Sequence, residues 1–175
     1  MKAINKFLQE TETIQIYLDM DGVICDWDGQ FIKYAKMSAN DYTEKYGEGG
    51  MWKLINNIGV KFWSDMPWMI DGKKLWDYVK QYNPIILSKP SRHPTCKIGK
   101  RIWIQKNLGK DVPYILEKDK SKYSDKGSLL IDDMVTNIYP WKQKGGLGIL
   151  HKNSNDTLAR LKNILRQVNF TREQK

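Results

Sequence analysis

The chain has 175 residues, of which 41% are hydrophobic and 28% charged, so it is long enough to bury a core and is not of disordered composition. No apolar run approaches the roughly 20 residues of a membrane helix, and two cysteines, Cys25 and Cys96, are too few for a disulfide framework. The net charge of +9 favours anionic partners such as nucleotides, nucleic acid or anionic lipid. We expect a soluble, cytoplasmic protein with no membrane partner.

Two carboxylates close the first predicted strand. Residues 1–12 are expected to form a short turn or helix, and a β-branched and aromatic run from Ile14 then predicts a strand that ends in Asp19 and Asp21. Gly22 permits a backbone turn that other residues resist. Open α/β sheets bind ligands beyond the carboxyl ends of their strands. Because clustered carboxylates repel each other, a cation beside them would stabilise the pair; the alternative is an ordinary polar turn.

An irregular, aromatic segment follows, from about residue 27 to residue 70. It has neither the alternation of a strand nor a long amphipathic helix, and Gly47, Gly49 and Gly50 interrupt its middle. We interpret it as a small, partly helical insertion. In such a segment each aromatic residue belongs to the core of the insertion more often than to a ligand platform.

The rest of the chain alternates helices and strands. Strands are expected at 85–88, 112–116, 128–131 and 147–150, with helices at about 95–108 and 137–144. Asp71 is predicted to cap a helix before them and Ser154 a helix after them. The apolar faces of these two helices are Leu75, Tyr78, Val79 and Tyr82, and Leu158, Leu161, Leu165 and Val168. The pattern predicts an α/β fold, a mostly parallel sheet flanked by helices, in one domain over 1–175 with an insertion at about 27–70.

Polar side chains lie at three of the predicted strand ends. Asp19 and Asp21 follow the first strand, Ser88 ends the second, and Asp132 and Asp133 end the fourth. Parallel strands bring their carboxyl ends to one edge of a sheet, so we expect these side chains to meet there. Asp19, Asp21 and Asp132 supply the oxygen ligands that Mg²⁺ prefers, and Asp133 would orient one of them.

Each of these residues also has a plain structural explanation. Asp132 and Asp133 would begin a helix after a strand, Ser88 would simply end one, and Lys120 would be an exposed lysine. Residues 89–126 hold eleven Lys and Arg against four Asp and Glu, which is +7 of the net +9. A solvated helix face or an anion-facing wall would account for that excess. The joint occurrence of polar residues at matching strand ends favours a site.

The same residues resemble the four motifs of the haloacid dehalogenase-like phosphatases, and more closely the 5′(3′)-deoxyribonucleotidase branch of that superfamily. The resemblance spans roughly residues 14–152. One departure is Ser88, where the branch often has Thr, which keeps the hydroxyl. The motifs that carry the resemblance are Asp19-Met20-Asp21-Gly22-Val23-Ile24-Cys25-Asp26-Trp27, Phe62-Trp63, Ile86-Leu87-Ser88, Asp119-Lys120-Ser121 and Leu129-Leu130-Ile131-Asp132-Asp133.

The resemblance implies a Rossmann-like core and a division of labour among the site residues. Asp19 would be the nucleophile that forms an aspartyl-phosphate, and Asp21 the general acid and base. Asp19, the backbone carbonyl of Asp21, and Asp132 would hold Mg²⁺. Ser88 and Lys120 would bind the phosphoryl oxygens. For Asp21 to donate a proton, burial and neighbouring carboxylates would have to raise its pKa.

The resemblance also places a small helical cap at the predicted insertion. Aromatic residues near the first motif and in the cap would stack on the nucleobase, and Trp27, Phe62 and Trp63 occupy the matching positions. Arg92 and Lys118 lie close in sequence to the phosphate-binding residues. They are candidates for substrate contacts, and each is equally compatible with an ordinary solvated charge.

Three functions remain open at this point. The first is a Mg²⁺-dependent phosphatase that hydrolyses ribo- or deoxyribonucleoside monophosphates, with a small-molecule nucleotide as its partner. The second keeps this chemistry but acts on a polynucleotide end or another phosphorylated metabolite; nucleic acid is possible but not favoured. The third is a non-catalytic nucleotide-binding module, which has no need of both Asp19 and Asp21. The sequence leaves monomer and homodimer equally open.

Overall fold

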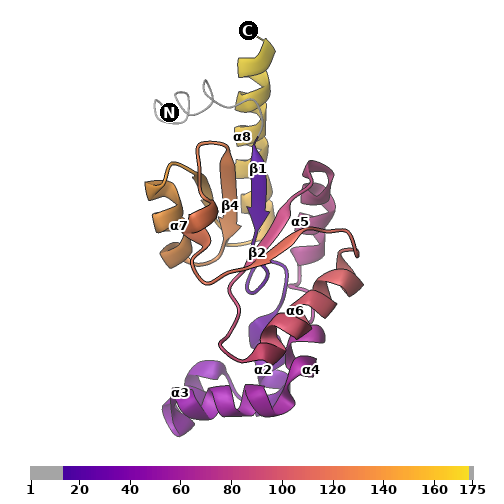
Figure 1. The fold of residues 1–175 in the computed structure, drawn as a ribbon, viewed down its shortest axis with the longest axis vertical. Coiled ribbons are helices and arrows are strands. Elements are labelled where there is room, and N and C mark those ends of the chain that lie inside the picture. Colours follow the sequence, from indigo (N-terminus) through magenta and orange to yellow (C-terminus); the bar gives the residue numbers. More distant parts are fainter. Residues whose placement is uncertain (1–13, 174–175) are drawn as a thin grey trace.

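Five parallel strands form the centre of the structure (Figure 1). The structure is a computed structural model. It describes the backbone of residues 14–173 and the side chains of residues 14–167. The strand order is β3-β2-β1-β4-β5. This is the predicted parallel α/β sheet. The predicted leading turn at 1–12 and the side chain of Val168 lie outside the described parts. The strands are β1 (Gln15–Leu18), β2 (Ile85–Ser88), β3 (Tyr114–Leu116), β4 (Ser128–Asp132) and β5 (Leu147–Leu150).

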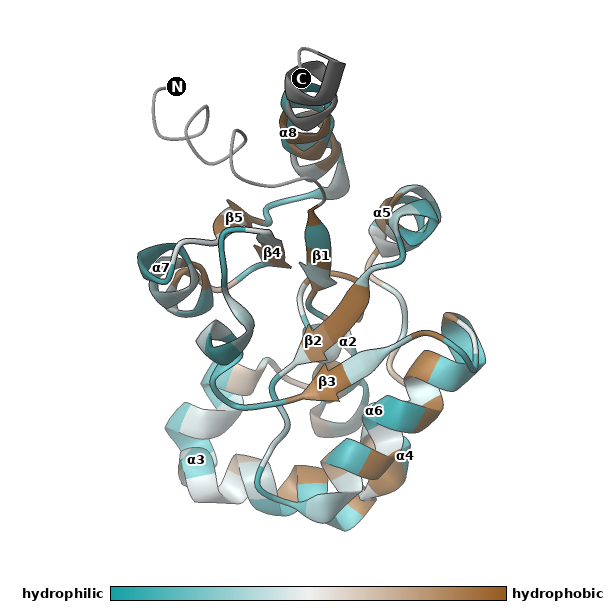
Figure 2. Ribbon diagram, turned by 45° about the horizontal axis from the view of Figure 1, so that its top comes forward, coloured by the Kyte–Doolittle hydropathy of each residue, from teal (hydrophilic) through white to brown (hydrophobic). Residues whose placement is uncertain are grey.

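Both faces of the sheet are covered, and the alternation of side chains along the strands separates two cores. One core holds the buried residues Leu18 and Ile131 together with apolar residues of α5 (Gly72–Val79) and α8 (Ser154–Glu173). The other holds Leu87 and Leu130 with Ile138 and Trp141 of α7 (Val135–Gln143). Burying each such Leu or Ile stabilises the fold by about 1.5–3 kcal/mol. In Figure 2 the strands carry much of the hydrophobic colour, while the helices show hydrophilic stretches between hydrophobic ones.

The remaining core helix, α6 (Pro94–Asn107), begins with a proline, which suits the first turn because that position needs no amide donor. Two short 3₁₀ helices, η1 (Lys80–Tyr82) and η2 (Lys120–Tyr123), complete the core. Within residues 14–173 no helix combines the length and the apolar character that a membrane span requires.

Three further helices lie between β1 and α5, where the sequence predicts the insertion. They are α2 (Trp27–Ala35), α3 (Ala39–Ile58) and α4 (Val60–Ser64). In α3 the chain kinks at Gly47, whose φ of 73° is outside the helical region. Figure 1 shows these helices beyond the ends to which the strands point. Phe31, Ile55 and Phe62 are fully buried among them, so two phenylalanines and an isoleucine form part of the core of this cap.

The two predicted helix caps are made differently from the expectation. Asp71 occupies the N-cap position of α5, but its Oδ2 accepts a hydrogen bond from the amide of Ser154, at 2.6 Å, in α8. The prediction that Ser154 caps α8 is wrong: Asn153 Oδ1 accepts from the amide of Asp156 at 2.9 Å, and Ser154 Oγ donates to the carbonyl of Asp71. Since α5 packs against α8, the free amides at the start of α8 are within reach of Asp71.

The contact between α4 and α6 is close enough that Gly99→Ala should destabilise the protein. A Cβ at Gly99 would lie 2.4 Å from Cβ of Trp63 and 2.6 Å from the carbonyl oxygen of Val60. Overpacking of this kind costs about 1–3 kcal/mol, more than the roughly 1 kcal/mol by which Ala exceeds Gly in helix propensity. We expect urea denaturation to show a lower free energy of unfolding for Gly99→Ala. The matched control is Gly49→Ala, where nothing lies within 4 Å of the added Cβ, and it should be neutral or stabilising.

Candidate active site

The loop after β1 is a compact turn that places two carboxylates at the centre of the sheet edge. The carbonyl of Met20 accepts hydrogen bonds from the amides of Val23, Ile24 and Cys25, at 2.8–3.2 Å. Gly22 has a φ of 72°, which side chains rarely adopt. A Cβ there would also lie 2.3 Å from Oδ2 of Asp133. Glycine is therefore required both by the turn and by the carboxylate that packs against it.

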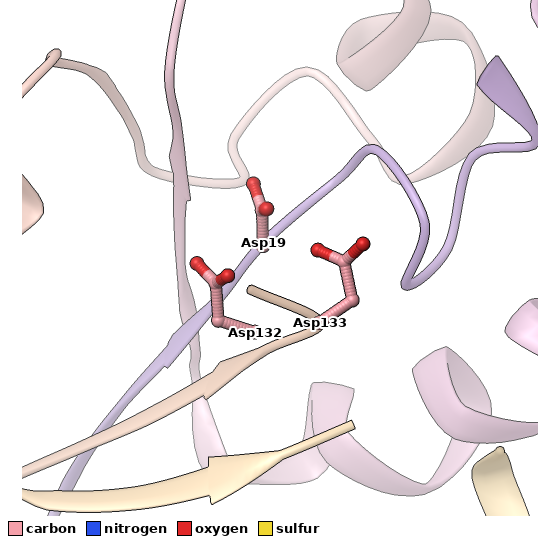
Figure 3. A group of neighbouring side chains, drawn as sticks. All are labelled: Asp19, Asp132 and Asp133. Carbon is pink, nitrogen blue, oxygen red and sulfur yellow. The ribbon is translucent and has the colours of Figure 1, made fainter. Parts of the chain in front are cut away.

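Three of the predicted site residues form an acidic cluster. Carboxylate oxygens of Asp19, Asp132 and Asp133 lie within 4.8 Å of one another (Figure 3). Burial raises the pKa of Asp132, and the neighbouring carboxylate of Asp19 adds to the effect. Burial likewise raises the pKa of Asp133 to about 7, with further contributions from Asp19 and Asp132. The site therefore holds negative charge that is not fully compensated by its surroundings.

Lys120 bridges two members of this cluster. Its Nζ lies 2.8 Å from Oδ1 of Asp19 and 2.6 Å from Oδ2 of Asp132, and its side chain is buried. Burial alone would lower the pKa of Lys120, but the two carboxylates outweigh that effect and raise it. Asp119 caps η2 by accepting hydrogen bonds from the amide and hydroxyl of Ser121, which fixes the start of the turn that carries Lys120.

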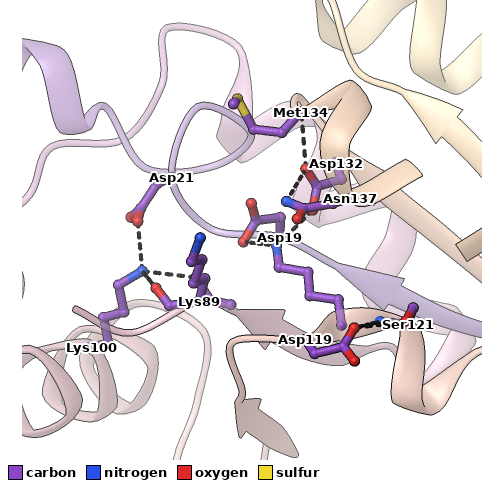
Figure 4. Close-up of polar contacts among 11 residues, drawn as sticks. Asp19, Asp21, Lys89, Lys100, Asp119, Ser121, Asp132, Met134 and Asn137 are labelled. Atoms are coloured by element: carbon purple, nitrogen blue, oxygen red, sulfur yellow. Dashed lines mark hydrogen bonds and ion pairs between the residues drawn. The ribbon is translucent and has the colours of Figure 1, made fainter. Parts of the chain in front are cut away.

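Asn137 is a site residue that the sequence analysis missed. Its Nδ2 donates to both carboxylate oxygens of Asp132, at 3.0 and 3.1 Å, and the amide of Met134 donates to Oδ1 at 2.8 Å. With Lys120 these donors fix the orientation of the Asp132 carboxylate (Figure 4). The signal in the sequence was an asparagine within the first turn of the helix that follows the Asp132-Asp133 pair.

Lys100 is a second missed residue, and it is fully buried. Its Nζ donates to Oδ2 of Asp21 at 2.6 Å, to Oγ of Ser88 at 2.8 Å and to the carbonyl of Lys89 at 3.2 Å (Figure 4). Although 30% of the Asp21 side chain is exposed, burial of its carboxyl raises the pKa; Lys100 opposes this and Asp19 adds to it. The available signal was a lysine that shares a helical face with Cys96 and Trp103.

The charges of these groups fit a divalent cation. Four carboxylates, those of Asp19, Asp21, Asp132 and Asp133, face two lysines, so the ionised site carries a net charge of −2. Oxygen donors of this kind are the ligands of Mg²⁺. The cluster at the sheet edge uses Asp133 rather than the carboxylate of Asp21, which is directed to Lys100 (Figure 4).

The other residues predicted to contact the substrate differ in how far they are buried. Trp27 is half-buried and stacks on Phe31, with ring centroids 5.4 Å apart. Phe62 is fully buried and Trp63 is 2% exposed, so both rings lie inside the cap. Arg92 and Lys118 are exposed, and the structure describes no contact between their side chains and the acidic cluster.

Comparison with solved structures identifies the architecture. A hydrolase from Streptococcus pneumoniae TIGR4 is similar with a TM-score of 0.52 and 12% identity, over 89% of this chain and 100% of that one. A haloacid dehalogenase-like family hydrolase from Xanthomonas campestris has a TM-score of 0.57 and 12% identity, over 91% and 99%. A predicted HAD-like family hydrolase from Porphyromonas gingivalis has a TM-score of 0.51 and 12% identity, over 89% and 99%.

The chain has the haloacid dehalogenase-like fold. At this level of identity the likeness concerns the fold alone. No protein-family profile matches the sequence, and no curated protein matches it either. Within the haloacid dehalogenase-like fold, the acidic cluster of this chain lies at the carboxyl edge of the parallel sheet, beside the central strand β1.

The raised pKa of Asp133 predicts that the metal-free protein loses stability as the pH rises from about 4 to above 7. In this range the folded state keeps the Asp133 proton, while the unfolded state releases it near the ordinary value of 3.8. Fewer protons in the unfolded state mean that the free energy of unfolding falls with pH. The carboxyl is partly open to solvent, so the contribution of Asp133 to the slope should stay below the roughly 1.4 kcal/mol per pH unit of one full proton.

Urea denaturation in EDTA between pH 5 and 8 measures this effect. Asp133→Asn should flatten the pH dependence without removing it, because the pKa values of Asp21 and Asp132 are also raised. The control is Asp77→Asn: Asp77 is exposed, and its hydrogen bond with Lys80 lowers its pKa, out of this range. An equal pH dependence in Asp133→Asn and in the unsubstituted chain would contradict the prediction.

Proposed function

We propose that this protein is a Mg²⁺-dependent phosphatase that hydrolyses nucleoside monophosphates, with deoxyribonucleotides preferred, through an aspartyl-phosphate. The observation that carries the proposal is the different environment of two carboxylates in one short loop. Asp19 faces Lys120 at 2.8 Å, whereas Asp21 is paired with Lys100 and has a raised pKa. One carboxylate thus forms an ion pair with a buried lysine, and the other is suited to carry a proton.

The proposed reaction has two balanced steps. In the first, a carboxylate oxygen of Asp19 forms a bond to phosphorus, the bond from phosphorus to the ester oxygen breaks, and Asp21 gives its proton to that oxygen. In the second, Asp21 takes a proton from water while the water oxygen attacks phosphorus. The bond from phosphorus to Asp19 breaks, which releases phosphate and restores both aspartates.

In this proposal the remaining polar groups hold the transferred phosphoryl group. Ser88 Oγ and Lys120 Nζ come from the ends of neighbouring elements around Asp19 and would stabilise the charge on the phosphoryl oxygens. Asp19, the carbonyl of Asp21, and Asp132 would hold Mg²⁺, and Asp133 would orient this group. When bound, Mg²⁺ would supply charge neutralisation between the phosphate and the carboxylates.

Support for a nucleotide substrate comes from the cap. Trp27 directly follows the loop that carries Asp19 and Asp21, and it is the one of the three predicted aromatic contacts that is only half-buried. A base stacked there would be recognised through its π-face, whatever its identity. The burial of Phe62 and Trp63 supports a role for them in shaping the cap around the base rather than in presenting a ring to solvent.

A polynucleotide end is the second candidate substrate, and one surface feature favours it. A pocket of about 300 Å³ beside the edge strand β3 is lined by Lys97, Ile98, Arg101, Tyr114 and Leu116. It combines two cations with an aromatic ring, a combination that binds single strands. The surface formed by residues 89–126 is less cationic than their sequence implies, because Lys100 and Lys120 are buried against aspartates.

The decisive experiment is phosphate release from a panel of ribo- and deoxyribonucleoside monophosphates, with Mg²⁺ or with EDTA. We expect turnover only with Mg²⁺, and a loss of at least about 10³-fold in kcat for Asp19→Asn, because the nucleophile is gone. Asp77→Asn, an exposed carboxylate paired with Lys80, should keep full activity. The proposal fails if no member of the panel is hydrolysed or if Asp19→Asn retains activity.

Salt dependence separates the two substrate classes. A polynucleotide bound through several phosphates should lose affinity steeply between 50 and 200 mM salt, by about 10-fold or more. A mononucleotide makes few such contacts, so its KM should change much less. We expect the shallow dependence, measured as KM for a nucleoside monophosphate and for a 5′-phosphorylated oligonucleotide across that range. A steep dependence together with a lower KM for the oligonucleotide would reverse the assignment.

A further inference from the structure

The contacts of Lys100 extend beyond those of an ordinary buried ion pair. We infer that Lys100 is a positioning residue: held by the Ser88 hydroxyl and the carbonyl of Lys89, it keeps the Asp21 carboxyl in the arrangement that the leaving-group oxygen requires. This inference rests on the proposed function and adds to it a residue in neither the motifs nor the acidic cluster. Lys100 reaches the site from α6, an element that contributes no other side chain to it.

The hydrogen-bonding capacity of Lys100 is used up within the protein. An ammonium group has three donors and no acceptor, and Lys100 Nζ has three acceptors: Asp21 Oδ2, Ser88 Oγ and the carbonyl of Lys89. No donor is left for a phosphate. Lys100 therefore differs from Lys120, whose two carboxylate partners both belong to the acidic cluster. It would act on the reaction through the groups that it holds.

The contact with Lys100 also distinguishes the two oxygens of the Asp21 carboxyl. Oδ2 accepts the hydrogen bond from Lys100, whereas Oδ1 is buried and has no hydrogen-bond partner among the described residues. A buried, unpaired carboxyl oxygen is costly unless another group contacts it. Because Oδ2 accepts from Lys100, Oδ1 is the oxygen that would carry the proton if Asp21 is the general acid. Ser88 Oγ accepts a hydrogen bond from the same ammonium group and helps to hold that group in place.

The cap completes the environment of this lysine. The ring of Trp63 in α4 lies with its centroid 5.5 Å from Lys100 Nζ, within the range of a cation–π interaction. Gly99, the residue before Lys100, allows this approach, because a side chain there would collide with Trp63 and with the backbone of α4. The position of the ammonium group is thus set from the core side by three acceptors and from the cap side by an aromatic ring.

The test compares kcat/KM for two leaving groups. An alkoxide from a nucleotide needs a proton as it leaves, whereas p-nitrophenolate does not. If Lys100 positions Asp21, Lys100→Met should lower kcat/KM about 10²-fold with a nucleoside monophosphate and less than about 10-fold with p-nitrophenyl phosphate. The control Lys106→Met, an exposed lysine on the same helix, should leave both values unchanged. Equal losses with the two substrates, or no loss with either, would overturn the inference.

A second comparison does not depend on p-nitrophenyl phosphate or on the stability of Lys100→Met. The pair Asp21→Asn and Asp21→Asn/Lys100→Met removes the acid first and then the lysine, and the double variant leaves no unpaired charge to unfold the protein. If Lys100 acts through Asp21, the second substitution should change kcat/KM for the nucleotide less than about 3-fold. A further 10-fold loss would overturn the inference. A wild-type protein that hydrolyses neither compound would instead refute the proposed function, and this inference with it.

Discussion

The accumulation of four carboxylates at one edge of the sheet is the constraint on which the site depends. Two lysines reduce their repulsion, and each lysine compensates a different part of the site. Lys120 lies between Asp19 and Asp132, and Lys100 is paired with Asp21. Removal of one member of such a buried pair typically costs about 3–5 kcal/mol, because the other charge is left without a partner. The apolar cores on both faces of the sheet must offset the unfavourable free energy of burying these charged groups. The site is therefore held together by charge balance as well as by the backbone.

The topology of the sheet explains why these residues meet. β1 is the central strand, and it pairs with β2 on one side and β4 on the other. Leu18 is in register with Ile86 and with Ile131, so the chain beyond it runs between the ends of both neighbours. Asp19 thereby lies beside Asp132, and Ser88 ends the strand on the other side. Strand order and register alone bring together residues that are more than 100 positions apart in the sequence.

The sequence predicted those features that depend on local pattern. Alternation and apolar runs located the five strands, and the strand ends located Asp19, Ser88 and Asp132. Features that depend on the packing of distant elements were missed. Lys100 and Asn137 lie on helices, where a polar residue usually faces solvent, and only the assembled structure shows that they face the carboxylates. For the same reason the caps of α5 and α8 differ from the prediction: Asp71 reaches the amide of Ser154 because the two helices pack together.

The aromatic residues of the cap are a further feature that depends on packing, and one of them lies next to the site. A sequence cannot tell an aromatic residue that presents its ring to a ligand from one that fills a core, and the structure buries Phe62 and Trp63. Burial does not separate Trp63 from the site, however, since its ring lies beside Lys100. Helix α6 is thus in contact with the cap on one side and with Asp21 and Ser88 on the other. If the cap selects the substrate, the helix that supports it also positions the groups that act on the phosphate, and selection and catalysis share one structural element.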